Sequence, residues 1–566
     1  MAFGGWVRTT TDADGRFAVE LPPGERLELR AYDIDHHYTS DGEPEPRERV
    51  ARSWTVTSPD DDLGDVPLAW WPYRDEVPVP RAAAVDGTLP QQYTAGFRRA
   101  LDLSVARALP VKALLEAERL LGPDRPTAAE IQAHQPVVRS VRADAAAPGV
   151  SRSDAWLGDL LLNGFHIALN LGRDADDPRR LRAVMDWGEV APRTDGPGFD
   201  LYDVDVVLEP RSAEVVPVRI DLRIRRAGPT GWASDQRRSV APGDPDWEAA
   251  KRIVRCQHLL QGAIDGHIVT GHFQTEAAAV AVFRNLRASP IRRLLHAHLQ
   301  EIVPQGRDGD GFAWGPNGIL LTQSALTYQA LQDRMRRLTA GMCWETFAPG
   351  PPVHPSHRYA HAAERFWALL GRYVAGFFAA NHDEIVAAWP EVRRFSDDWV
   401  RRSPPYDPLP ADPRVVTLRE AGPVRRVEVD GILRSAPPVT TTDAPAPGDL
   451  ERLQQLCKVI LFRATFDHTW THDGQYDAGG DLLLATFGLR NGGLGPESDA
   501  SLLPPPSVML DAITVNSIGI HANYGMILAD EERDVPPALK AAVEAEREAF
   551  AALGVDVDHI RSRINI

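Results

Sequence analysis

The chain has 566 residues and a mass of 62.3 kDa, more than one compact core normally organises, so we expect two or more domains. Its composition, with 43% hydrophobic and 25% charged residues, is typical of an ordinary globular protein. The formal net charge of -17 argues against a nucleic-acid binder, because affinity for phosphate requires clustered Lys and Arg.

Cysteine usage and the apolar segments indicate the cellular compartment of the protein. Cys256, Cys343 and Cys457 are too few and too scattered for a disulfide framework or a Cys-type zinc site, which fits a reducing environment. No charged segment followed by an apolar one opens the chain, and the longest apolar stretch, 367–380, is interrupted by Arg372. We therefore expect a cytoplasmic protein without a transmembrane segment. A lipid would be met as a ligand or through peripheral contact with a membrane.

The first part of the chain has the pattern of β-strands. Segments 17–21 and 27–32 alternate between apolar and polar residues, and Asp14-Gly15 and Pro22-Pro23-Gly24 are turn signals between them. The hairpin TDADGRF and the LPPG turn resemble transthyretin-like or carboxypeptidase-regulatory-like modules. We predict such a β-sandwich over residues 1–75, either abbreviated or continued upstream, and a Pro-rich linker over 76–93.

Residues 94–566 are predicted to form one large helical domain, so the fold class is mainly α with a small, truncated β-sandwich in front. Ser153 or Asp154 is expected to cap a helix whose apolar stripe includes Trp156 and Leu160. A strand-rich insert follows at 200–210 and 215–226, where β-branched residues alternate with polar ones. From Trp247 onward the pattern is mostly helical.

Two histidines lie in the segment GHIVTGHFQTE of the helix predicted from Trp247 onward. His267 and His272 are five residues apart, and a regular α-helix would turn their side chains about 140° away from each other. A local π-type turn would bring both imidazoles to one side of the helix, and such turns concentrate at functional sites. We therefore predict a π-type turn near His267 to His272, provided that a second metal-binding segment exists.

The second segment is CKVILFRATFDHTWTHDGQYDAGG. His468 and His472 are four residues apart on an apolar helix, which places their rings on one face, about 40° apart. Four histidines on two buried helices are typical of a transition-metal site with open coordination positions.

These residues resemble the lipoxygenase family. Trp247-Glu-Ala-Ala-Lys251 matches the family's W-x-x-A-K, and the spacing from there to His267 and His272 contains no gap. Further matches are Glu276, Pro290-Ile-Arg-Arg-Leu-Leu, Asn317-Gly318-Ile319, Cys457, His468, His472, Gly474-Gln475-Tyr476 and Gly479-Gly480. The resemblance runs from about Ser151 to the last residue and implies a bacterial-type lipoxygenase-like protein.

The resemblance implies one non-haem iron held by His267, His272 and His468, with manganese as an alternative because some members tolerate it. The position that is Asn, His or Ser in the family is His472 here, and the last ligand is the main-chain carboxylate of a terminal Ile, here Ile566. Gln475 matches the family's glutamine that joins the metal ligands to the substrate pocket.

The implied reaction is a dioxygenation. In the family a metal-bound hydroxide takes a hydrogen atom from a polyunsaturated fatty acid, the radical combines with O2, and a hydroperoxide results. No catalytic side chain beyond that hydroxide is required.

Several features depart from the family's pattern. The residue that steers oxygen insertion falls near Arg307, or on Gly306 or Gly309 after a local shift, and the tail that leads to Ile566 is short. The Arg-rich segment 333–338 is interpreted as a solvated helix face rather than a carboxylate anchor. Two alternatives stay open: a related iron oxygenase acting on a biosynthetic intermediate that is not a fatty acid, and a catalytically inactive lipid-binding homologue.

Overall fold

The chain divides into two compact units, Met1–Asp75 and Glu76–Ile566, in the computed structural model. The structure describes residues 27–38, 44–56, 113, 127, 130–131, 133, 140–142, 153–188, 190–193, 198–228, 231–300, 302, 313–315, 318–341, 344–345, 347–402, 427–429, 432–434, 439–440, 442–478, 485–490, 504, 509, 512, 525–530 and 534–564.

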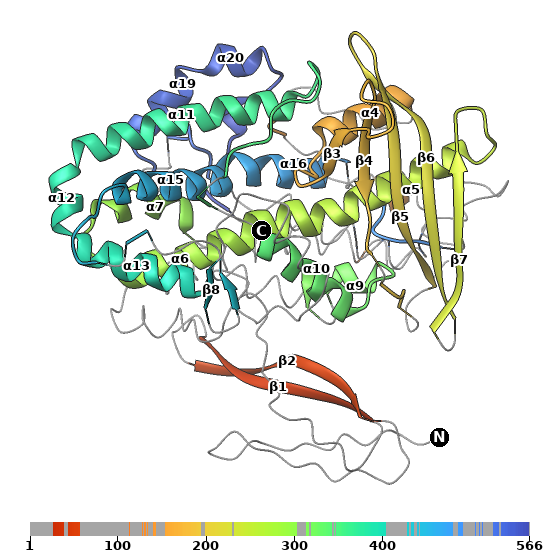
Figure 1. Cartoon of the computed structure of the whole chain (residues 1–566), viewed down its shortest axis with the longest axis horizontal. Coiled ribbons are helices and arrows are strands. Elements are labelled where there is room, and N and C mark those ends of the chain that lie inside the picture. The colour runs from red at the N-terminus through yellow and green to blue at the C-terminus, as the bar shows by residue number, and fades with distance from the viewer. Residues whose placement is uncertain are drawn as a thin grey trace. The chain divides into compact units, whose positions relative to one another are not determined.

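The described part of the first unit is one antiparallel pair of strands (Figure 1). Strand β1 (Leu27–Tyr38) pairs with β2 (Pro44–Val56), and the register shifts between Ala31 and Tyr32. The strand predicted at 27–32 is confirmed. The hairpin predicted at 14–24 lies outside the described residues, so the sandwich and the linker remain predictions.

The second unit contains an antiparallel sheet. Its strand order is β3-β4-β5-β6-β7, and β10 also pairs with β5. The strands are β3 (Asn170–Arg173), β4 (Leu181–Met185), β5 (Phe199–Pro210), β6 (Val215–Gly228), β7 (Gly231–Val240) and β10 (Leu489–Arg490). Val204 and Val206 on β5 and Ile220, Leu222 and Ile224 on β6 are buried, as the alternating pattern requires. The predicted strand-rich insert is therefore confirmed.

Helix α4 (Asp154–Asn163) packs against β6, and its start is joined to the next helix. The Ser153 side chain accepts from the Trp156 N–H at 3.1 Å, which confirms the predicted cap. Trp247 Nε1 and Lys251 Nζ both donate to Asp154 Oδ1, at 3.0 and 2.8 Å. Trp247 and Lys251 lie four residues apart on one helix face, so the W-x-x-A-K motif fastens α5 to the start of α4.

The remainder of the described second unit is mainly helical (Figure 1). The central path is α5 (Trp247–Gln261), the π-helix η2 (Gly262–Phe273) and α6 (Gln274–Asn285), which follow one another without a break. The later path is α15 (Asp449–Phe462), the short π-helix η4 (Arg463–Asp467) and α16 (His468–Ala478). The other elements are α7 (Pro290–Leu299), α9 (Ile319–Thr322), α10 (Tyr328–Gly341), α11 (Arg358–Ala380), α12 (His382–Ala387), α13 (Trp389–Arg402), β8 (Val427–Val429), β9 (Ile432–Arg434), α19 (Pro537–Glu544), α20 (Arg547–Ala551) and the 3-10 turn η5 (Val557–His559).

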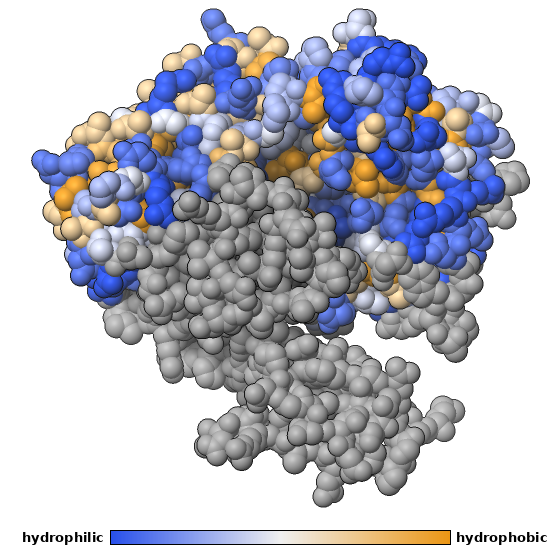
Figure 2. All heavy atoms as spheres, in the orientation of Figure 1, coloured by the Kyte–Doolittle hydropathy of each residue, from blue (hydrophilic) through white to orange (hydrophobic). Residues whose placement is uncertain are grey.

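These helices enclose the main hydrophobic core, which contains Phe366 of α11, Phe462 of α15 and Phe466 of η4, all fully buried. Their rings pack within 6.4 Å of one another, which ties the later path to α11. On the face shown in Figure 2, hydrophilic residues cover most of the coloured surface and hydrophobic ones emerge in patches. Over the described residues, none of the helices combines the length and the apolar character needed to traverse a bilayer.

Candidate metal centre

The π-helix η2 places the first two histidines. It runs over 12 residues, Gly262–Phe273, and is buried along its whole length. Its wider turn brings His267 and His272 to one side, with their Nε2 atoms 3.3 Å apart. The Thr270 hydroxyl donates to the Asp265 carbonyl oxygen at 2.7 Å, which gives that carbonyl an additional partner inside the helix. The predicted π-type turn is confirmed, and the π-helix extends beyond the segment between the two histidines.

Glycines next to these histidines allow the second helix path to approach. A Cβ atom on Gly271 would lie 3.3 Å from Cδ2 of His468, and one on Gly266 would lie 3.4 Å from Cγ2 of Thr471. Gly266 and Gly271 directly precede His267 and His272. The two glycines are therefore also five residues apart, and both face α16.

Helix α16 supplies the second pair. His468 and His472 have ring centroids 5.5 Å apart, as the spacing of four predicted. The second π segment, η4, was not predicted from the sequence. It ends at the residue before His468. The Thr465 and Thr469 hydroxyls donate to the carbonyls four residues earlier, at 2.6 and 2.7 Å. Each buried hydroxyl therefore has a hydrogen-bond acceptor within its own helix path.

Three ring nitrogens converge where the two paths meet. His267 Nε2 lies 3.1 Å from His468 Nε2, and the ligand atoms of His267, His272 and His468 all lie within 4.8 Å of one another. The three residues are at most 4% exposed. The ring of His472 lies beside this group, 5.6 Å from the ring of His267 between centroids.

Burial keeps these imidazoles neutral. It lowers the pKa of His267 to about 4, and it lowers the pKa values of His272, His468 and His472 well below the ordinary value. At neutral pH each ring therefore carries one proton and one lone pair, which is the form that binds a transition metal.

The hydrogen-bond partners test whether this group suits a cation. Gln475 Oε1 lies 2.8 Å from His267 Nδ1, so the ring donates there and its Nε2 keeps the lone pair. Nδ1 of His272 and Nδ1 of His468 are buried and have no hydrogen-bond partner among the described residues. Three neutral rings that crowd their Nε2 atoms together would repel one another or leave polar atoms unsatisfied. A cation at their meeting point would take all three lone pairs, so the residues present fit a metal ion.

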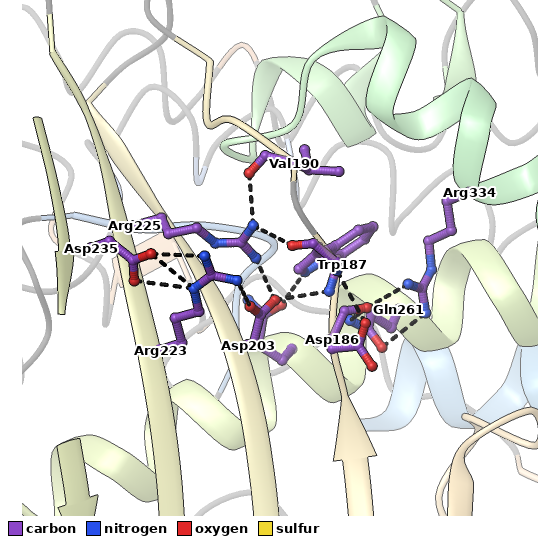
Figure 3. A network of polar contacts seen from close by, with 11 residues as sticks. Asp186, Trp187, Val190, Asp203, Arg223, Arg225, Asp235, Gln261 and Arg334 are labelled. Atoms are coloured by element: carbon purple, nitrogen blue, oxygen red, sulfur yellow. Dashed lines mark hydrogen bonds and ion pairs between the residues drawn. The ribbon is translucent and has the colours of Figure 1, made fainter. Parts of the chain in front are cut away.

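A buried polar network holds the start of the π-helix (Figure 3). Arg334 of α10 donates to Asp265 Oδ1 at 2.7 Å, to the Asp186 carbonyl at 2.6 Å and to Gln261 Oε1 at 3.0 Å. Its guanidinium also lies 4.6 Å from the centre of the Trp187 ring. The interpretation of segment 333–338 as a solvated face is therefore wrong for Arg334, because Asp265, 69 residues away in sequence, supplies the opposite charge that burial requires.

The same network continues into the sheet. The Trp187 backbone N–H donates to Asp203 Oδ1 at 2.8 Å, and Asp203 forms an ion pair with the fully buried Arg225 of β6. Arg225 also donates to the carbonyl of Val190 at 2.7 Å (Figure 3). The hydrogen bonds and ion pairs of these charged groups thereby join the sheet to the helix that carries His267 and His272.

Ile566 and the oxygen-steering candidates Gly306, Arg307 and Gly309 lie outside the described residues. Sequence reasoning missed Trp314, which is 4% exposed and whose ring centroid lies 6.2 Å from that of His272. Its neighbour Phe273 packs edge-on against it at 5.5 Å. No local pattern distinguishes this tryptophan.

Comparisons with known proteins show which of them are similar to this chain. No family model matches the chain. It is 22% identical over 253 residues to the linolenate 9R-lipoxygenase of Nostoc sp., covering 44% of this chain and 28% of the relative. It is 24% identical over 390 residues to the polyunsaturated fatty acid lipoxygenase ALOX15 of Bos taurus, covering 61% and 50%. The crystal structure of a 9R-lipoxygenase from Cyanothece PCC8801 matches with a TM-score of 0.76 and 30% identity, covering 98% of this chain and 86% of that one. The aligned part thus spans half or less of the two curated relatives, whereas the structural match extends over nearly all of this chain.

Proposed function

The chain belongs to the lipoxygenase family, and we propose that it is a non-haem iron dioxygenase that inserts O2 into a polyunsaturated fatty acid or a related lipid. The product would be a hydroperoxide. The observation that carries this proposal is the convergence of the Nε2 atoms of His267, His272 and His468 inside a buried helical core.

The proposed ligand set has five members. His267, His272 and His468 supply the converging nitrogens, and His472 completes an all-histidine version from the same helix face. The main-chain carboxylate of Ile566 is proposed as the remaining ligand. It is supported by the burial of the segment that precedes it, since Ile560, Ser562 and Ile564 are fully buried. Iron is proposed over manganese because the family is an iron family, and the same donors would accept manganese.

The side chains around the site bind and orient, and none is required to move a proton. Iron, when bound, supplies the one-electron oxidation that removes a hydrogen atom from the substrate. Gln475 holds the His267 ring in the tautomer whose Nε2 faces the other histidines. Phe273 and Trp314 pack beside His272, and the burial of the whole group keeps water from a carbon-centred radical.

One experiment tests the proposal against its two alternatives. The purified protein is assayed for iron and manganese by mass spectrometry, and for oxygen consumption with linoleate and other polyunsaturated fatty acids. Stoichiometric iron with oxygen consumption and a hydroperoxide product is expected. Iron without consumption would favour an oxygenase for a biosynthetic intermediate that is not a fatty acid. Absence of any bound metal, after reconstitution with ferrous iron, would favour a catalytically inactive lipid-binding homologue.

A further inference from the structure

The segment close to the last residue runs through the interior. Ile560, Ser562 and Ile564 are fully buried, and Arg561 is 4% exposed. Segments near a chain terminus usually fray unless specific contacts fasten them. We call residues 560–564 the C-terminal strap.

Main-chain hydrogen bonds hold the strap on two sides. The Ile527 N–H donates to the Ile560 carbonyl and the Ser562 N–H donates to the Gly525 carbonyl, both at 2.8 Å. The Arg561 N–H donates to the Thr469 hydroxyl at 2.9 Å. Thr469 follows His468 on α16, so the strap is bonded directly to the helix that carries two ligand candidates.

A buried ion pair makes the second contact with α16. The guanidinium of Arg561 binds the Asp473 carboxylate, and their side chains are 5% and 1% exposed. Asp473 Oδ2 also accepts from the Val141 N–H at 2.7 Å, and Oδ1 lies 3.4 Å from His472 Nδ1. One carboxylate therefore contacts the strap, the segment at 140–142 and the ring of His472.

A buried ion pair is a poor device for stability alone, because an apolar pair of similar volume packs as well without the cost of desolvating two charges. The advantage of a charged pair is that its hydrogen bonds have a defined direction. A carboxylate that accepts from His472 Nδ1–H leaves the lone pair on Nε2, and it fixes the plane of the ring. Arg561 in turn fixes the carboxylate with a planar, multi-donor group.

We propose that Asp473 and Arg561 are positioning residues that orient the ring of His472 and lock the C-terminal strap in register with α16. This inference rests on the proposed function, because it assumes that His472 faces a bound iron. The contacts of this pair are with His472, the strap and the segment at 140–142, so its proposed effect is on the geometry of the ligands.

The test uses the full-length, iron-loaded protein and a double variant, Asp473→Leu with Arg561→Met, which keeps an apolar filling of the site. The matched control is Asp558→Leu with Arg547→Met, which removes an exposed ion pair of 2.7 Å in the same C-terminal region. Three quantities are measured: iron affinity, the electron paramagnetic resonance spectrum of the ferric protein, and amide hydrogen exchange of residues 560–564.

The core double variant is expected to fold, to lose about 10–100-fold in iron affinity, and to show an altered ferric spectrum and faster exchange in the strap. The control is expected to match the wild type in all three. Arg561→Lys alone, which retains the charge but loses the planar, multi-donor group, is expected to alter the ferric spectrum and to quicken amide exchange in the strap. It keeps the test decisive if the double variant fails to fold.

Two results would overturn the inference while leaving the proposed function intact. A folded double variant with the wild-type spectrum and iron affinity would make the ion pair a packing feature only, while the proposed function stood. A wild-type ferric spectrum and wild-type strap exchange in Arg561→Lys would likewise show that the planar group of Arg561 does not orient His472 through Asp473. Wild-type protein that takes up no iron would instead overturn the proposed function, and this inference with it.

Discussion

His267 and His272 are five residues apart in the chain, yet their Nε2 atoms lie 3.3 Å apart. A regular α-helix of the same sequence would separate these side chains by about 140°. The π-helix is therefore what converts two histidines of one helix into a pair, and its local geometry is maintained by packing against α16 and by the network around Asp265.

The ligand role of His468 is tested by His468→Ala. Two of the three converging nitrogens would remain, so iron affinity is expected to fall by more than about 10-fold, with a matching loss of oxygen consumption. Iron is measured by mass spectrometry and folding by circular dichroism. His382→Ala is the control, since that side chain is 57% exposed and lies on α12, away from the group. Full iron occupancy in His468→Ala would show that the ligand assignment is wrong.

The close approach of η2 and α16 is tested by Gly271→Ala. The new methyl group would lie 3.3 Å from Cδ2 of His468, so that ring must shift, and weaker iron binding with an altered ferric spectrum is expected.

Gly376→Ala is the matched control, because nothing lies within 4 Å of a Cβ at this position in helix α11. There the substitution should stabilise the protein by about 1 kcal/mol, since alanine favours a helix interior over glycine. Wild-type iron binding in Gly271→Ala would indicate that the two helices have room to separate.

The buried pair of Arg334 and Asp265 is tested by Arg334→Gln. The Asp265 carboxylate, whose side chain is 2% exposed, would lose its cation, and a loss of about 3 kcal/mol in the free energy of unfolding is expected. Urea unfolding followed by tryptophan fluorescence measures it, with Trp187 beside the substituted residue.

Arg293→Gln provides the comparison for this pair. Arg293 and Glu384 form an ion pair whose side chains are 59% and 63% exposed, so its loss should cost less than about 1 kcal/mol. Equal effects of the two substitutions would contradict a special role for the Arg334 network.

Two buried histidines outside the proposed ligand set make stability depend on pH. Burial lowers the pKa of His166 to about 3 and that of His298 to about 4, whereas both would titrate near 6.5 in the unfolded chain. Between these values the unfolded chain binds more protons, so stability falls as the pH drops from about 6.5 towards 4, by up to about 1.4 kcal/mol per pH unit for each histidine.

The measurement is the free energy of unfolding in urea across that pH range. His166→Gln, which cannot take up a proton, should show a shallower dependence than the wild type. An unchanged slope would mean that His166 is already protonated in the folded protein or stays neutral in the unfolded one.

Much of the site could be predicted from local sequence. The spacing of His468 and His472 implies a shared helix face, and the spacing of His267 and His272 implies a π-type turn, because both follow from residues per turn. The strands at 200–210 and 215–226 and the Ser153 cap likewise depend on neighbours in sequence, and all appear as expected.

The charged supports of the site could not be predicted in this way. Arg334 reaches Asp265 across 69 residues of sequence, and Arg561 reaches Asp473 across 88. Taken alone, each of these side chains has the sequence character of a solvated surface group, because a charge reveals nothing about the partner that will meet it in the interior.

The sequence by itself thus determined which residues carry the nitrogen donors and on which helices they lie, since helical periodicity is a local property of the chain. The tertiary structure alone decided that the two histidine helices meet at glycines, with three Nε2 atoms converging, and that arginines from α10 and the C-terminal strap hold them there. Burial is the physical reason, because a charge removed from water must find its partner wherever the fold places one.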